Sequence, residues 1–445
     1  MTRPRPPLRM IQGGAGLGPS AMGPALELAG IGAGLTLTMA LLGAMPGWLQ
    51  RLGAFQGLFT LAFGFYALAL WGLRRYARLP HVGLAVLAVA LATRAALFPA
   101  APSLSDDIYR YVWEGRVVAS GGNPYRQSPL DPALAPLRDA VIYPRINHKE
   151  LSTIYPPLAE AGFALVARVV PTVWGFKLWV VLHDLALVAV LAWWARRRGG
   201  SAAPALVYAW NPLVLIEYAG SGHHDPTGML WLALALVLAD SRPVASALAL
   251  AAAALVKLAP LLALPFLLRR WPWRARWVAL VTLAVGLGWF WLQTRGAAAG
   301  LNAFWGTWRN NELGFFYLDR LLGGFGPARV AALGLVAAAL AYAWWRERAP
   351  AAAARLGLRG GTLVSPVVHP WYLGWVLMLE PLGPSPPWLL LSFTAILNYG
   401  VFATTALGRD FHPTLAWRWV EFGVPLLLAL GLTLRARRAP AAPVD

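Results

Sequence analysis

Long apolar runs constrain this chain more than any other feature. A stretch of roughly eighteen or more apolar residues can cross a bilayer, and it must be helical because lipid cannot hydrogen-bond a free backbone. Full-length stretches lie near residues 25–46, 54–73, 82–100, 174–195, 202–220, 275–293, 328–345 and 416–434, and shorter or interrupted ones near 157–170, 226–239, 244–268, 358–382 and 386–404. We therefore expect an all-α polytopic membrane protein with about thirteen transmembrane or re-entrant helices.

The strong positive charge fits a membrane protein better than a nucleic-acid-binding one. The formal net charge is +19, and arginines gather at the ends of apolar segments, at 74–78, 196–198, 269–270, 346–348 and 435–438. This distribution follows the positive-inside rule and also favours anionic lipid heads, so we expect no nucleic-acid partner. The chain has no cysteine, which excludes disulfides and thiol catalysis.

The same pattern predicts a topology. With a cytoplasmic N-terminus, the first three segments place residues 101–156 outside, whereas the orientation of the stretch between residues 158 and 194 stays open. Prolines predict a break near Lys257 and another at Ser365 to His369. Polar stations then lie on one membrane face, at 101–156, 220–226, 295–326 and 365–372. We expect one transmembrane domain over residues 1–438, a disordered tail at 439–445, and a bacterial inner-membrane location with an outward-facing active site.

Acidic residues concentrate in the predicted outer loop. The chain has only 19 Asp and Glu, and six of them lie between Asp106 and Glu150. Asp106 and Asp107 are adjacent at the exit of a membrane segment. Near lipid the pKa of an unpaired carboxyl rises, which suits a general base for a sugar hydroxyl. The alternative is that this pair caps an amphipathic helix predicted over 107–119, and both interpretations can hold together.

Two further stations carry polar side chains beside membrane segments. Tyr155, followed by two prolines, would be held rigidly against a lipid-linked substrate, or the prolines merely start a helix. His223, His224 and Asp225 join two apolar segments. They could bind a divalent cation or a phosphate, or they form a polar turn.

The interrupted segments also supply candidates. His369 at a predicted helix break could contact a phosphate oxygen, while nearby Tyr372 is also typical of an interfacial aromatic belt. Lys257 could neutralise a phosphate or extend to a lipid head group. Asn and aromatic residues at 308–317 could hold a sugar, and the intramembrane pair His183 and Asp184 could serve function or helix packing.

An ordered set of motifs resembles one enzyme superfamily. The motifs are Ser-Asp-Asp-Ile-Tyr-Arg at 105–110, Gly-Gly-Asn-Pro-Tyr at 121–125, Tyr-Pro-Pro at 155–157, His-His-Asp at 223–225, Lys-Leu-Ala-Pro at 257–260 and His-Pro-Trp-Tyr at 369–372. Together they resemble GT-C integral-membrane glycosyltransferases. The closest likeness is to the bacterial branch of polyprenol-phosphate-mannose-dependent α-mannosyltransferases.

The resemblance implies a lipid-phosphate-linked sugar donor, an acceptor outside the cytoplasm and inversion at the anomeric carbon. The expected enzyme is a hexosyltransferase that moves mannose from a polyprenyl phosphate to a lipid or glycan acceptor. The catalytic acid of the superfamily carries over to Asp106, with Asp107 as its close rival. The candidates for donor or phosphate binding are Arg110, Arg116, Tyr155, His223, His224, Asp225, Lys257, His369 and Tyr372. A divalent cation such as Mg²⁺ or Mn²⁺, if one is used, would be held by Asp106, Asp107, His223, His224 and Asp225.

Two other function classes stay open. A flippase for lipid-linked sugars would share the broken spans and intramembrane charges. The polar residues gather on one membrane face, however, and no inverted repeat is visible, which favours the enzyme. A non-catalytic membrane scaffold would leave the acidic pair without a role.

Overall fold

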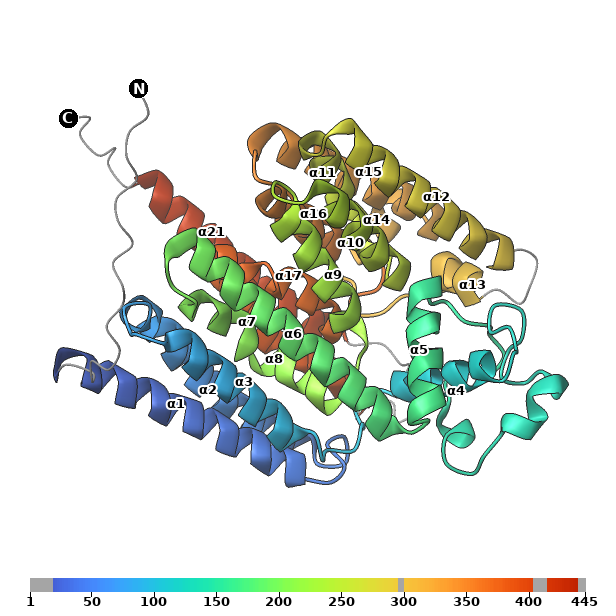
Figure 1. The fold of residues 1–445 in the computed structure, drawn as a ribbon, viewed down its shortest axis with the longest axis horizontal. Coiled ribbons are helices and arrows are strands. Elements are labelled where there is room, and N and C mark those ends of the chain that lie inside the picture. The colour runs from blue at the N-terminus through green and yellow to red at the C-terminus, as the bar shows by residue number, and fades with distance from the viewer. Residues whose placement is uncertain (1–18, 295–299, 403–413, 439–445) are drawn as a thin grey trace.

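A computed structural model describes residues 19–294, 300–402 and 414–438 (Figure 1). Over these residues the protein is helical apart from turns and one isolated bridge between Asn310 and Val367. The expected all-α class is therefore confirmed. The expected tail at 439–445 and the start of the polar station at 295–326 lie outside the described residues.

Six described helices are long and apolar enough to cross a membrane. They are Met22–Ala44 in α1 (Pro19–Ala44), α2 (Leu52–Tyr76), α6 (Val173–Gly199), α12 (Trp273–Thr294), α15 (Phe325–Arg346) and Leu415–Ala436, which joins α20 (Leu415–Arg418), η9 (Trp419–Gly423) and α21 (Val424–Arg438). Shorter apolar helices are α3 (Val82–Leu97), α9 (Asp225–Leu238) and α10 (Pro243–Val256). The protein thus has the composition of a multi-pass membrane protein, but a count of about thirteen spans is not confirmed.

One expected span is broken. The stretch 202–220 folds as η3 (Ala203–Ala205), α7 (Leu206–Ala209), α8 (Pro212–Val214) and the π-helical turn η4 (Leu215–Gly220). Pro212 has no backbone N–H to continue a helix, and the Asn211 side chain accepts a hydrogen bond from the Leu213 N–H at 3.0 Å, which starts a new helix. The prediction of one continuous segment was wrong because it relied on the length of the apolar run, which does not register the break at Asn211 and Pro212.

The N-terminal helices pack through a buried ion pair. Arg94 on α3 donates to Asp184 on α6 at 2.7 Å, and both side chains are fully buried. The Tyr208 hydroxyl also donates to Asp184, at 2.7 Å. Of the two interpretations of the pair at 183–184, helix packing is the one that these contacts favour.

The loop at 101–156 folds into a helical layer at one end of α1, α3 and α6 (Figure 1). The amphipathic helix predicted at 107–119 is present as α4 (Asp107–Ala119), and it packs against α5 (Pro157–Val169). A side chain at Gly115 would collide with the Phe163 carbonyl oxygen, so the two helices require glycine there. The 3₁₀ turns η1 (Pro132–Leu137) and η2 (Tyr143–Arg145) lie in the same loop.

Both predicted breaks occur. Lys257 is extended, with φ −156° and ψ 142°, between α10 and the pair η5 (Ala259–Ala263) and α11 (Leu264–Arg270). The second break, at 365–369, separates α16 (Pro350–Val364) from η6 (Pro370–Leu373) and α17 (Gly374–Leu377). The remaining elements are α13 (Gly300–Thr307), α14 (Gly314–Leu322), η7 (Glu380–Leu382), α18 (Pro386–Thr394) and η8 (Ala395–Gly400). The breaks deliver polar backbone and side chains to one cavity.

Candidate active site

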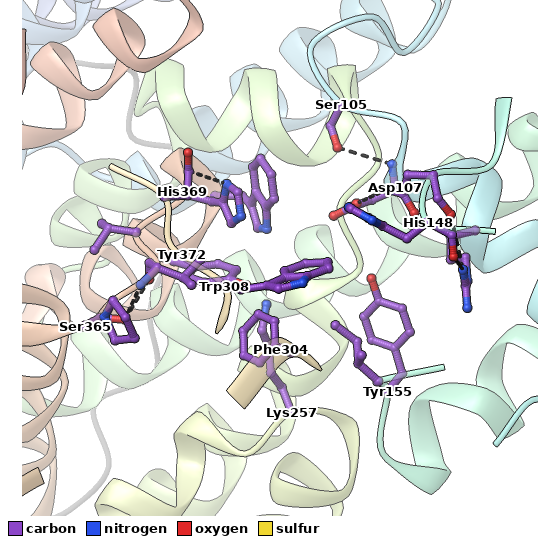
Figure 2. A pocket seen from close by; sticks show the side chains of 18 of the residues that line it. Ser105, Asp107, His148, Tyr155, Lys257, Phe304, Trp308, Ser365, His369 and Tyr372 are labelled. Atoms are coloured by element: carbon purple, nitrogen blue, oxygen red, sulfur yellow. Dashed lines mark hydrogen bonds between the residues drawn. The ribbon is translucent and has the colours of Figure 1, made fainter. Parts of the chain in front are cut away.

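A cavity of about 1130 Å³ lies between α4 and the two broken segments (Figure 2). Its polar part is lined by Asp106, Asp107, Asn147, Tyr155, Lys257, His369 and Tyr372. Its apolar part is lined by Leu262, Leu301, Phe304, Trp305, Leu333 and Val336. The cavity thus offers a polar compartment continuous with an apolar one.

The acidic pair opens into the polar part. Asn147 donates one amide group to both acids, to Asp106 Oδ1 at 2.7 Å and to Asp107 Oδ1 at 3.1 Å. Asp106 is exposed, whereas only 24% of the Asp107 side chain is. Burial and, next, the charge of Asp106 raise the pKa of Asp107 to about 7. Asp107 is therefore a carboxyl that can take up or release a proton near neutral pH.

The contacts of Asp106 and Asp107 do not support the interpretation that this pair caps the helix. Asp106 occupies the N-cap position of α4, but its side chain makes no capping hydrogen bond. The Ser105 hydroxyl instead accepts from the Asp107 N–H at 3.2 Å. Both carboxylates are consequently free to face Asn147 and the cavity.

A stack of three rings forms the wall behind Asp107. The His223 and Trp371 rings are 3.7 Å apart and nearly parallel, and Trp371 stacks on His369 at 4.3 Å. His223 Nδ1 lies 3.7 Å from Asp107 Oδ2, and its Nε2 lies 3.5 Å from Oε2 of Glu217. Two histidines that the sequence predicted as site residues, and that lie far apart in the chain, thus stack on the indole ring of the same tryptophan.

His224 points away from this stack into an aromatic cluster. Its ring contacts Tyr111, Tyr155 and Phe163 edge-on, with centroids 5.0 to 5.2 Å apart. Figure 2 shows the Tyr155 hydroxyl pointing into the cavity toward Asp107. Tyr155 and Pro156 thus both line the cavity, and the His224 ring packs against the Tyr155 ring.

Lys257 presents the ammonium group at the first break. It donates to Asp225 Oδ1 at 2.5 Å and lies 4.2 Å from the centroid of the Tyr372 ring. The same Asp225 oxygen accepts from Trp375 Nε1 at 2.7 Å. The Lys257 side chain keeps 23% exposure, whereas Asp225 has 1%. Asp225 thus orients Lys257, which reaches the cavity.

His369 is oriented by an asparagine. The Asn310 amide nitrogen lies 2.8 Å from His369 Nδ1. An amide N–H can only donate, so Nδ1 accepts and the ring proton resides on Nε2. Asn310 is itself held by the bridge to the second break, through backbone hydrogen bonds to Pro366 and Val368 at 3.0 and 2.8 Å. His369 is therefore a hydrogen-bond donor toward the cavity.

The two arginines predicted for phosphate have other partners. Arg110 donates to Glu114 at 2.5 Å and to the carbonyl oxygens of Asn147, His148 and Leu151 at 3.2, 2.9 and 2.5 Å. These bonds hold the loop that carries Asn147 over the acidic pair. Arg116 pairs with Asp139 and the Pro171 carbonyl oxygen, away from the residues that line the cavity. In this structure Arg110 supports the site and Arg116 lies outside it.

The described residues contain no group of three or more His, Asp or Glu side chains arranged to hold a metal ion. The residues expected for a divalent cation are instead divided between partners. Asp106 and Asp107 share Asn147, Asp225 pairs with Lys257, and His224 packs on aromatic rings. This set does not fit a metal centre, and we derive no step through one.

Sequence reasoning did not single out several cavity residues. Asn147 and His148 have no motif around them, although both lie in the loop at 101–156, which is rich in acidic residues. His148 has a left-handed backbone (φ 42°) and stacks on Trp308 at 4.7 Å. Asn310 and Trp308 were noted only as part of a loop able to hold a sugar. The one available signal for these residues was their place in polar stretches of a largely apolar chain.

Comparison with known proteins gives the family. The family model described as "Alpha-(1->6)-mannopyranosyltransferase, N-terminal domain" matches residues 21–273. A "Probable alpha-(1->6)-mannopyranosyltransferase" of Mycolicibacterium smegmatis is 27% identical over 78% of this chain and 74% of its own length. "Alpha-(1->6)-mannopyranosyltransferase A" of Mycobacterium tuberculosis is 27% identical over 64% of this chain and 62% of its own length. No solved structure matches the chain.

The matched segment includes α4, the acidic pair, the three residues at 223–225 and the break at Lys257. It spans more than half of the 445 residues. It thereby confirms the likeness to GT-C bacterial mannosyltransferases that the motifs indicated. The chain belongs to the alpha-(1->6)-mannopyranosyltransferase family.

Proposed function

We propose that this protein transfers a mannosyl residue from a polyprenyl-phosphate donor to a hydroxyl group of a glycan or lipid-linked acceptor. Transfer takes place on the extracytoplasmic side of a bacterial inner membrane and inverts the anomeric carbon. The observation that carries the proposal is the place of Asp107, which shares the Asn147 amide with Asp106 and lines one cavity with Lys257 and His369. The family membership and the names of the relatives support mannose as the sugar.

Asp107, rather than Asp106, acts as the general base. A base works best when its pKa lies near the operating pH, and partial burial brings Asp107 into that range. Asp106 is exposed to solvent. Its negative charge helps to raise the pKa of Asp107. The resemblance alone had favoured Asp106, with Asp107 as the rival.

The reaction is a single displacement. The acceptor oxygen forms a bond to the anomeric carbon as its proton moves to the Asp107 carboxylate. The bond between that carbon and the phosphate oxygen breaks, and the polyprenyl phosphate leaves with the electron pair. The developing phosphate charge is stabilised by preorganised donors. Lys257 supplies a cation and His369 an Nε2–H from the two breaks that border the cavity.

The two compartments suit the two parts of such a donor. An isoprenoid chain gains from leaving water, at about 25 cal/mol per Å² of buried apolar area. Residues of α13, η5 and α15 provide apolar lining in the same cavity as Lys257 and His369. The sugar and phosphate would lie in the polar part, with the acceptor hydroxyl at Asp107.

Asp107→Asn and Asp106→Asn variants test the proposal. Each is assayed in detergent for transfer from radiolabelled polyprenyl-phosphate mannose to membrane glycolipid acceptors. We expect Asp107→Asn to lower kcat by about a hundred-fold or more, and Asp106→Asn to retain measurable transfer. Full transfer by Asp107→Asn would refute the base. The flippase would instead be favoured by two results together. The wild type would transfer no sugar, and the double variant would still translocate a lipid-linked sugar in vesicles.

A further inference from the structure

Glu217 is a buried acid that the mechanism above does not use. It lies in the π-helical turn η4 and is 1% exposed. Its Oε1 accepts a hydrogen bond from the Tyr399 hydroxyl at 2.6 Å. Its Oε2 has no hydrogen-bond partner in the described part of the chain, and His223 Nε2 lies 3.5 Å from it.

His223 connects Glu217 to the proposed base. Nε2 of its ring faces Glu217 Oε2 and Nδ1 faces Asp107 Oδ2, at 3.5 and 3.7 Å. Neither nitrogen has a closer hydrogen-bond partner among the described residues. Stacking on Trp371 at 3.7 Å restricts rotation of the ring. The two carboxyl groups therefore decide which nitrogen of His223 carries the proton.

The cost of burying charge decides how the protons are distributed. An ionised carboxylate in a dry interior needs a cation or several donors, and Glu217 has one hydroxyl donor and no Lys or Arg partner in the described chain. The Asp107 side chain is still partly exposed to the cavity, and it also accepts a hydrogen bond from Asn147. A single negative charge shared by these groups is thus best placed on Asp107, with the proton on Glu217.

We propose that Glu217 is a protonated positioning residue that fixes His223 as its Nδ1–H tautomer. The Tyr399 hydroxyl donates to Glu217, Glu217 donates to His223 Nε2, and His223 Nδ1–H donates to Asp107 Oδ2. All donors in this series point toward the base, so each bond polarises the next. Each oxygen of Asp107 then accepts one hydrogen bond, Oδ2 from His223 and Oδ1 from Asn147, and a remaining lone pair of the carboxylate takes the acceptor proton. The inference rests on the proposed function because it gives Asp107 the role of base.

The two contacts of His223 are longer than the roughly 3.0 Å of an ordinary N–H···O bond. Closing them from 3.5 and 3.7 Å requires shifts of about 0.5 and 0.7 Å, which the exclusion of water by substrate would favour. The other charged or titratable groups around His223 are Asp225, Lys257, His369 and His224. Those around Asp107 are Asp106, Lys257, Asp225 and the hydroxyl groups of Tyr111, Tyr155, Tyr372 and Tyr399. A substitution at position 217 replaces none of these residues, although Glu217→Leu also removes the acceptor of the Tyr399 hydroxyl.

Glu217→Leu and Glu217→Gln separate this role from others. Leucine keeps the volume but cannot donate to Nε2. We expect Glu217→Leu to lower kcat/KM by about 10- to 100-fold, by analogy with residues that orient the histidine ligands of metal sites. The acidic limb of the pH profile of kcat/KM should move to higher pH in this variant. The reason is that Asp107 loses a hydrogen-bond donor that favours its ionised form. Glutamine accepts from Tyr399 through its oxygen and donates through its amide, as the neutral acid does. Glu217→Gln should therefore restore most of the activity and return the limb to its wild-type position.

A folded Glu217→Gln protein as impaired as Glu217→Leu would overturn the inference, because Glu217 would then act in its ionised form. Wild-type activity in Glu217→Leu would also overturn it. Should Glu217→Leu fail to fold in detergent, His223→Asn and His223→Gln decide. Asparagine places its amide near Nδ1 and glutamine near Nε2, so His223→Asn should be the more active, and the reverse order contradicts the tautomer. Asp107→Asn separates the two proposals: if it is active, the base assignment itself fails.

Discussion

Asn147 should set the pH range in which the enzyme works. Its amide donates to Asp107 Oδ1 at 3.1 Å and to Asp106 Oδ1 at 2.7 Å. These bonds favour the ionised carboxylates and lower the pKa of Asp107, against burial and the charge of Asp106, which raise it to about 7. Asn147→Leu removes the donors and keeps a similar side-chain volume.

The size of the shift follows from the bond that is lost. A hydrogen bond to a charged group contributes about 1.5–3 kcal/mol, and one pKa unit corresponds to about 1.4 kcal/mol. Because one amide group serves two acids, the lower value applies, which is about one pH unit. The base must be ionised to act, so activity is lost as the pH falls through the pKa of Asp107. Asn147→Leu should therefore move the acidic limb of kcat/KM from about pH 7 to about pH 8.

The assay is kcat/KM for mannosyl transfer from pH 5 to 9, at constant ionic strength. Asp106→Asn is the matched control, because removing the neighbouring charge lowers the pKa of Asp107 and should move the limb in the opposite direction. An acidic limb that stays in place in both variants would refute the assignment of that limb to Asp107.

The remaining predictions concern charges at two depths. Lys257→Gln should lower kcat/KM by about 100-fold, because in the proposed mechanism this cation stabilises the leaving phosphate. Arg270→Gln, at an exposed pair with Asp240, should have almost no effect on transfer. Similar kinetics for the two variants would contradict the role of Lys257. Asp184→Asn should destabilise the protein by about 3 kcal/mol, since it leaves the buried Arg94 without its counter-ion. Arg75→Gln, which breaks the half-exposed pair with Glu27, should change stability by less than about 1 kcal/mol. Thermal unfolding in detergent measures both, and equal midpoints would show that the Arg94–Asp184 pair is not what holds α3 to α6.

Local chemistry made several elements predictable from sequence. The helix at 107–119 has a polar and an apolar face at helical spacing, and Gly121 follows it with a left-handed φ of 86°. Proline at 260, 366 and 370 removes backbone donors, so the breaks near Lys257 and at 365–369 were visible in the sequence. The stretch 202–220 misled the same reasoning because its apolar composition concealed a break at Asn211 and Pro212.

The amino-acid sequence by itself determined the helical class, the membrane character and the position of the polar stations, because these depend on hydrophobic length and on proline, which act over a few residues. Only the tertiary structure decided the partners of the polar side chains. Arg110 binds Glu114 and the backbone of a loop. Asn147 binds the acidic pair, 40 residues away in sequence at Asp107. Glu217 binds Tyr399, 182 residues away. A buried charge or hydrogen-bonding group must find a partner wherever the fold brings one within about 3 Å, and that distance is set by helix packing between segments far apart in the chain.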